Sequence, residues 1–229
     1  EEFRGELDRL AGWWMTHSPD PVHGGFVGAI GYDNEPDMGA EKGTILNTRI
    51  LWTFSELAAR DPTPGYRAMA ERAFEYIAGR FVDPVHGGVW WALTPEGEPA
   101  SRRKQVYAQA FAIYGACAYF HLTADKRAIN LAMELAGWLE SRAWDHRRGG
   151  YVEAFAEDWT PIEDVRLSTR DLQANKTMNT HLHVLEAYTA LARVHPMAST
   201  RALLEKNIRL LGDRFIAPRG THQSLFFDT

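Results

Sequence analysis

Hydrophobic residues recur at intervals of three and four along most of the chain, which is the spacing of amphipathic helices. The segment 42–60, for example, carries Ile45, Leu46, Ile50 and Leu57 at this spacing. Turn-forming residues such as proline and glycine separate one such segment from the next. The pattern predicts seven helices, over roughly 2–16, 42–60, 65–81, 103–123, 126–143, 174–194 and 199–214.

A short motif recurs between the predicted helices. Residues 20–26 read Asp-Pro-Val-His-Gly-Gly-Phe, and residues 83–89 repeat this motif with valine at the last position. Residues 145–151 are a weaker copy, and residues 214–220 are a degraded fourth copy. The first glycines of the three Gly-Gly pairs lie 63 and 62 residues apart. Because Asp and Pro followed by Gly-Gly end a helix and turn the chain, each copy predicts a turn followed by a short hairpin.

Each repeat therefore holds two helices and a hairpin in about 62 residues. This unit fits a closed toroid with an inner and an outer ring of helices, since open α-solenoids use shorter repeats of about 33–47 residues. Six such repeats would need about 370 residues, whereas this chain of 229 residues holds about three and a half. We therefore expect an all-α (α/α)6 toroid, of which residues 1–229 form a single domain that is incomplete on its C-terminal side.

Composition and charge exclude several classes of partner. Hydrophobic residues make up 45% of the chain, charged residues make up 24%, and the net charge is −5 with no basic run, so we expect no nucleic-acid partner. No apolar run reaches the roughly 18 residues that span a membrane, and no signal peptide is visible. These observations favour a cytoplasmic protein with no membrane partner. We expect a monomer or dimer. The single cysteine, Cys117, lies in an apolar run and is expected to be a buried core residue.

Polar side chains interrupt two of the apolar stripes. Arg49 lies among apolar residues, where a buried guanidinium is costly without a partner. It could bind a carboxylate within the fold or stabilise negative charge on a substrate oxygen, and the sequence leaves both interpretations open. Tyr107, Phe111 and Tyr114 fall on one helix face. Tyr107 is therefore either a core tyrosine or a polar group at a central cavity.

A further polar group lies at the start of the predicted helix 174–194. Asn179 and His183 are four residues apart and share a helix face, whereas His181 points elsewhere. Histidine and asparagine at this position suit a network of sugar hydroxyls or acid–base chemistry, and a core histidine is the alternative. The histidine spacing matches no zinc motif. Asp171, just before the helix, is either part of the same network or a loop and capping acid.

Three blocks of the sequence, at residues 41–55, 103–114 and 175–188, resemble the cellobiose 2-epimerases of the N-acylglucosamine 2-epimerase superfamily. The third block, Asn-Lys-Thr-Met-Asn-Thr-His-Leu-His-Val-Leu-Glu-Ala-Tyr, is the most specific. The resemblance covers essentially the whole chain and implies an (α/α)6 barrel. It also implies that the substrate is a β-1,4-linked disaccharide whose reducing-end glucose is inverted at C2, with no metal and no nucleotide cofactor.

The implied reaction opens the sugar ring, removes the C2 proton next to the aldehyde, and passes through an enediolate. Such a reaction needs a base and a group that stabilises the enolate oxygen. The resemblance implies that Arg49 stabilises the enediolate and that Tyr107, Asn179 and His183 hold the reducing-end sugar near the reacting carbons. We therefore expect Arg49 and His183 to take part in catalysis, and Tyr107, Asn179 and Asp171 to bind the sugar.

The resemblance further implies two acid–base histidines, one of them in a Gly-His-Asp segment shortly after a Phe-Phe-Asp stretch. The sequence reaches Phe-Phe-Asp at residues 226–228, so we expect little or no epimerase activity from this chain by itself. A mannose isomerase or an N-acylglucosamine 2-epimerase is the nearest alternative. An inverting glycoside hydrolase would need two facing carboxylates, and Glu41, Asp164 and Asp171 give no evident pair. A non-catalytic sugar-binding module is the third alternative.

Overall fold

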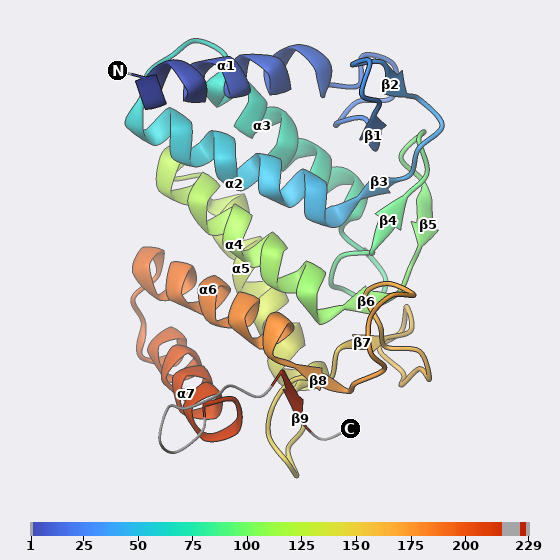
Figure 1. The fold of residues 1–229 in the computed structure, drawn as a ribbon. Coiled ribbons are helices and arrows are strands. Elements are labelled where there is room, and N and C mark those ends of the chain that lie inside the picture. The colour runs from blue at the N-terminus through green and yellow to red at the C-terminus, as the bar shows by residue number, and fades with distance from the viewer. Residues whose placement is uncertain (1, 217–224, 228–229) are drawn as a thin grey trace.

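A computed structural model describes residues 2–216 and 225–227, and it contains helices in all seven predicted segments (Figure 1). Helices α2, α4 and α6 begin two to four residues later than predicted, because a two-residue strand precedes each of them. Two other segments end in a π-helical turn, η1 (Ile77–Phe81) and η2 (Leu139–Ala143). The helices are α1 (Glu2–His17), α2 (Thr44–Arg60), α3 (Tyr66–Tyr76), α4 (Val106–Thr123), α5 (Lys126–Trp138), α6 (Met178–Val194) and α7 (Ala198–Arg214).

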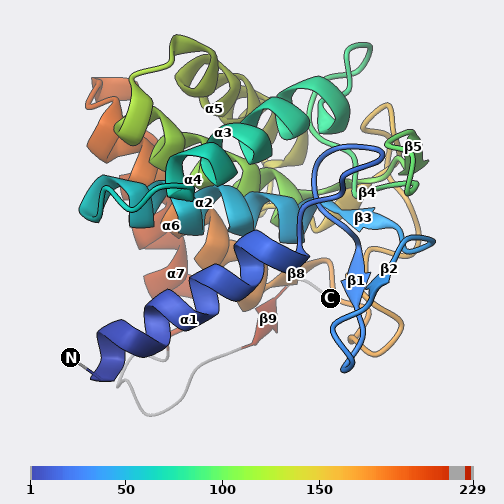
Figure 2. The ribbon, with the colours of Figure 1, turned by 90° about the horizontal axis from the view of Figure 1, so that it is seen from above.

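The helices form two layers, as Figures 1 and 2 show. Helices α2, α4 and α6 lie side by side, α4 packing on both α2 and α6. Each has an outer partner that follows it in the chain: α3 packs on α2, α5 on α4 and α7 on α6. Helix α1 lies against α2. Three helix pairs and one further helix match the prediction of about three and a half repeats of an α/α toroid.

Helix α4 lies at the centre of this arrangement and is buried along most of its length, including Val106, Ala108, Ala112 and Ala116. Small side chains on α4 allow its neighbours to approach closely. A Cβ atom added at Gly115 would lie 3.0 Å from the carbonyl oxygen of Thr48, so glycine lets the α2 backbone approach α4 closely at this point. Tight packing of this kind fixes the positions of side chains on the inner helices relative to one another.

Short antiparallel strands gather at the N-terminal ends of the inner helices (Figure 1). Strands β3, β6 and β8 lead directly into α2, α4 and α6, and each pairs with a strand that comes later in the chain, β4, β7 and β9 respectively. Strand β2 pairs with β1, and β5 pairs with β4. The strands are β1 (Ala29–Ile30), β2 (Pro36–Asp37), β3 (Lys42–Gly43), β4 (Ala92–Leu93), β5 (Pro99–Ser101), β6 (Lys104–Gln105), β7 (Ala154–Phe155), β8 (Lys176–Thr177) and β9 (Phe226–Phe227).

The repeated motif has one structure in its first three copies. A bridge closes each turn, pairing Pro19 with Phe26, Val82 with Val89 and Trp144 with Tyr151, so the predicted small hairpins are confirmed. The motif's aspartate accepts hydrogen bonds from the backbone N–H groups two and three residues later. It also binds, at 2.7 Å, a lysine in the short strand that leads into the next inner helix. These ion pairs are Asp20–Lys42, Asp83–Lys104 and Asp145–Lys176. Residues 217–220 of the fourth copy lie outside the described residues.

Two expectations from composition can be compared with the structure. Cys117 is buried, as expected for a core residue, and burial raises the pKa of its thiol to about 12. None of the described helices combines the length and the apolar character that crossing a membrane would need.

Candidate functional site

The lysines of β3, β6 and β8 give a common reference for comparing the three inner helices. Positions five residues after these lysines, Asn47, Gln109 and His181, are fully buried. The Gln109 side chain accepts a hydrogen bond from the Val89 N–H at 2.7 Å, and His181 Nε2 accepts one from the Tyr151 N–H at 2.9 Å. Both bonds hold the repeated hairpin against the inner helix. This position is therefore structural in the second and third repeats, whereas in the first repeat Asn47 donates to the Gly43 carbonyl of its own segment.

His181 has no ring nitrogen left for substrate. Its Nδ1 lies 2.6 Å from the Thr177 carbonyl oxygen, while Nε2 accepts from Tyr151, so the ring is the neutral Nδ1–H tautomer. Burial lowers the pKa of His181 to about 4. The prediction that His181 points away from Asn179 and His183 is confirmed.

Positions three and seven residues after the lysines lie on another face of the inner helices. Position seven holds Arg49, Phe111 and His183, and position three holds Tyr107 on α4 and Asn179 on α6. The Arg49 guanidinium lies 4.9 Å from the centre of the Phe111 ring, and the His183 ring lies 4.5 Å from it. Four of the five predicted site residues, Arg49, Tyr107, Asn179 and His183, thus converge from α2, α4 and α6. They gather around Phe111, which was expected only to share a helix face with Tyr107.

Tyr107 is at the centre of this cluster. Its ring meets the His183 ring edge-to-face at 4.7 Å. Burial raises the pKa of Tyr107, while the charge of Arg49 and hydrogen bonding with Arg49 and Asn179 act in the opposite direction. The phenol is therefore a neutral O–H group between α2 and α6, able to donate a hydrogen bond to a ligand oxygen.

The sequence analysis was wrong about the burial of Arg49. The side chains of Thr48 and Ile50 are buried, but Arg49 is exposed. A helix turns by about 100° per residue, so Arg49 leaves the core and faces the same side as Phe111 and His183. A solvated guanidinium needs no structural carboxylate, which leaves it available to a ligand.

Asp171 lies apart from this cluster. Its carboxylate accepts hydrogen bonds from the Ser168 N–H at 2.8 Å and the Ser168 hydroxyl at 2.9 Å, closing a turn in the loop before β8. It shares with Asn179 the lining of a cavity of about 290 Å³. The structure thus places Asp171 in a loop beside Asn179, without a hydrogen bond to Arg49, Tyr107 or His183 among the described residues.

Glu153 lines the same cavity and was not predicted from the sequence. It is almost fully buried and accepts hydrogen bonds from the Thr180 hydroxyl at 2.5 Å and the Thr177 N–H at 2.8 Å, which caps the start of α6. Burial raises its pKa to about 7. The repeat gives no signal for it, because the corresponding residues of the other two copies are Gly28 and Trp91.

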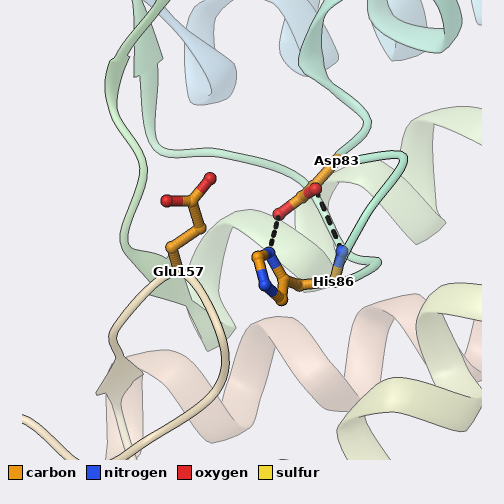
Figure 3. Close-up of side chains that lie close together, drawn as sticks. All are labelled: Asp83, His86 and Glu157. Carbon is orange, nitrogen blue, oxygen red and sulfur yellow. Dashed lines mark hydrogen bonds and ion pairs between the residues drawn. The ribbon is translucent and has the colours of Figure 1, made fainter.

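Another group of side chains, Asp83, His86 and Glu157, has ligand atoms within 4.8 Å of one another (Figure 3). However, the Asp83 carboxylate also binds the buried Lys104 ammonium at 2.7 Å. A second cation beside this ammonium would be repelled. Because Asp20 and Lys42 form the same ion pair in the first repeat, we interpret the group as a structural turn.

Two of the three acids considered for a hydrolase, Asp164 and Asp171, do not favour that chemistry. Hydrogen bonds from Arg166 lower the pKa of Asp164 to about 2, so its carboxylate is ionised at neutral pH and is a poor general acid. The Asp171 carboxylate is occupied by Ser168.

Comparison with known proteins gives a consistent result. Residues 24–229 match the family model of N-acylglucosamine 2-epimerase (GlcNAc 2-epimerase). The chain is 41% identical over 229 residues to a cellobiose 2-epimerase from Bacteroides fragilis, covering 100% of this chain and 58% of that protein. The structure superposes on cellobiose 2-epimerase from Spirochaeta thermophila with a TM-score of 0.89 at 38% identity, covering 99% of this chain and 57% of the other. For the enzyme from Bacillus thermoamylovorans the TM-score is 0.93 at 31% identity, covering 99% and 58%. The chain thus spans little more than half the length of the relatives that it matches, and the resemblance and the α/α-barrel fold are confirmed.

Proposed function

The chain belongs to the N-acylglucosamine 2-epimerase family, and we propose that it forms the sugar-binding side of a site that epimerises the reducing-end glucose of a β-1,4-linked disaccharide at C2. Cellobiose is the first candidate substrate, since the relatives described above are cellobiose 2-epimerases. The observation that carries the proposal is the convergence of Arg49, Tyr107, Asn179 and His183 from three inner helices.

The proposed chemistry assigns different tasks to these groups. Removal of the C2 proton from the open-chain aldehyde leaves negative charge on O1, and a fixed positive charge beside O1 lowers the barrier. Arg49 supplies this charge, and its exposure on the side of the inner helices that holds Phe111 leaves it accessible to a ligand oxygen. The Tyr107 hydroxyl, neutral because burial raises its pKa, donates a hydrogen bond beside it.

Helix α6 supplies the other half of the sugar contacts in this proposal. Asn179 offers both a donor and an acceptor to the sugar hydroxyls, and His183 offers a ring nitrogen near the reacting carbons. The His183 ring packs against Tyr107 and Phe111 of α4, and these contacts limit the directions that the nitrogen can take. Asp171, which lines the same cavity as Asn179, completes the proposed set of sugar-binding groups.

Incubation with cellobiose in D₂O, followed by NMR, tests the proposal. We expect cellobiose to bind and the Arg49→Met variant to bind it more weakly, with deuterium exchange at C2 slow or undetectable in this chain by itself. Rapid exchange would show that this chain already holds the proton-transfer groups. Release of free glucose, or binding that Arg49→Met leaves unchanged, would refute the proposal.

The choice of sugar is tested in the same experiment. Mannose and N-acetylmannosamine are added in separate samples, because a mannose isomerase or an N-acylglucosamine 2-epimerase would bind these monosaccharides through the same enediolate chemistry. A preference for cellobiose over both sugars supports the disaccharide assignment. A preference for either monosaccharide would replace it.

A further inference from the structure

His183 has a carboxylate partner on its own helix. Its Nδ1 lies 2.6 Å from Oε2 of Glu186, one turn later on α6. An ionised carboxylate only accepts hydrogen bonds, so the proton of a neutral His183 ring must be on Nδ1. The other ring nitrogen, Nε2, then carries a lone pair.

The surroundings of the ring fix its orientation as well as its tautomer. Tyr107 meets the His183 ring edge-to-face at 4.7 Å, and Phe111 lies 4.5 Å away on the same neighbouring helix. Contacts on these sides leave the ring little freedom to turn. Among the residues that the structure describes, no hydrogen bond reaches Nε2 of His183, whereas His181 uses both of its nitrogens within the fold.

Glu186 also faces the candidate site electrostatically. Burial raises the pKa values of Tyr107 and Tyr114, and the negative charge of Glu186 raises both further. The carboxylate therefore lies near the same cluster that Arg49 approaches from α2. Although Glu186 itself is exposed, its negative charge acts on the side chains of the candidate site.

We propose that Glu186 is a positioning residue that holds His183 as the Nδ1–H tautomer, with the Nε2 lone pair available to the sugar. This inference rests on the proposed sugar site for the role of Nε2, but the tautomer itself is a property of the free protein. In the site, Nε2 accepts a hydrogen bond or a proton from the sugar, and the resulting positive charge on the ring is stabilised by the carboxylate.

The direct test is the ¹⁵N NMR spectrum of the histidine rings, recorded across a pH titration without sugar. In the unmodified chain we expect a protonated Nδ1 and a bare Nε2 for His183 in its neutral form. Glu186→Ala removes the acceptor, so the two tautomers should exchange, and the Nε2 shift should move toward the protonated value. Glu186→Gln should retain much of the original pattern, because an amide oxygen still accepts from Nδ1–H.

Two controls separate positioning from general damage. His181, whose tautomer is fixed by Thr177 and Tyr151, should keep its shifts in every Glu186 variant. Glu134→Ala removes an exposed glutamate from the outer helix α5 and should leave His183 unchanged. A protonated Nε2 in the unmodified chain, or an unaltered His183 pattern in Glu186→Ala, would overturn the inference.

Sugar binding provides a separate readout. We expect Glu186→Ala to weaken cellobiose binding about fivefold, the effect of one impaired hydrogen bond. If the chain binds no cellobiose but the tautomer pattern is as expected, the proposed function fails while the tautomer assignment stands. If binding is normal in Glu186→Ala, the positioning role is refuted.

Discussion

His181 and His183 are two residues apart, and the structure predicts opposite consequences of replacing them. His181→Ala removes a fully buried ring that accepts from the Tyr151 N–H and lies against Phe215. Leaving the buried Tyr151 amide without its acceptor costs about 1–3 kcal/mol, and the cavity left by the ring adds about 2 kcal/mol. We therefore expect the free energy of unfolding to fall by about 4 kcal/mol, or the Tm by about 10 °C for a chain of this size.

The repeat supplies a matched replacement. Gln109 occupies the equivalent position of the preceding repeat and binds the equivalent N–H group, that of Val89. His181→Gln should therefore restore the acceptor and recover about half of the loss. His183→Ala, in contrast, removes a partly exposed ring from the face of α6 that carries the candidate site and should cost about 1 kcal/mol or less.

Thermal and urea unfolding followed by circular dichroism measure these differences. The reasoning is refuted if His183→Ala destabilises the protein more than His181→Ala, or if His181→Gln is no more stable than His181→Ala.

The pH dependence of stability gives a second check. The folded-state pKa of His181, about 4, lies below the unfolded value of about 6.5. The stabilisation from the neutral ring is therefore complete above pH about 6.5 and is lost as the pH falls toward 4, a loss absent from His181→Gln.

Three further predictions concern other parts of the molecule. Burial raises the pKa of Glu153 to about 7, above its ordinary value of 4.5, so its contribution to stability is complete below pH 4.5 and is lost as the pH rises through 7. Urea unfolding at several pH values should therefore show that the free energy of unfolding of Glu153→Gln, relative to that of the unmodified chain, rises by on the order of 3 kcal/mol across this range. Gly25→Ala should cost more than about 2 kcal/mol, because Gly25 has a φ of +62° and a Cβ there would lie 2.5 Å from the Tyr76 ring. Gly12→Ala, in open space within α1, should be neutral or stabilising, and equal Tm values for the two variants would contradict this reasoning. Iodoacetamide should leave Cys117 unmodified in the folded protein and alkylate it after unfolding, as mass spectrometry would show; rapid alkylation of the folded chain would be inconsistent with its buried, high-pKa thiol.

Local patterns account for much of what could be predicted about the site. Arg49, Tyr107, Asn179 and His183 were identified as polar interruptions of apolar helix faces, which is local information. Aligning the three lysines that precede the inner helices would also have distinguished the buried His181 from His183, because Asn47 and Gln109 occupy the same register as His181.

The sequence by itself determined the helices, the turns and the approximate number of repeats. These follow from interactions among residues close along the chain: apolar spacing selects helix, and Asp-Pro with Gly-Gly ends it. Only the tertiary structure decided that Tyr107 lies between groups from α2 and α6, that Arg49 is exposed, and that Glu153 is buried beneath the start of α6. Those outcomes depend on how helices far apart in the chain pack together. The apolar spacing within a single helix does not determine which side chains of other helices lie against it.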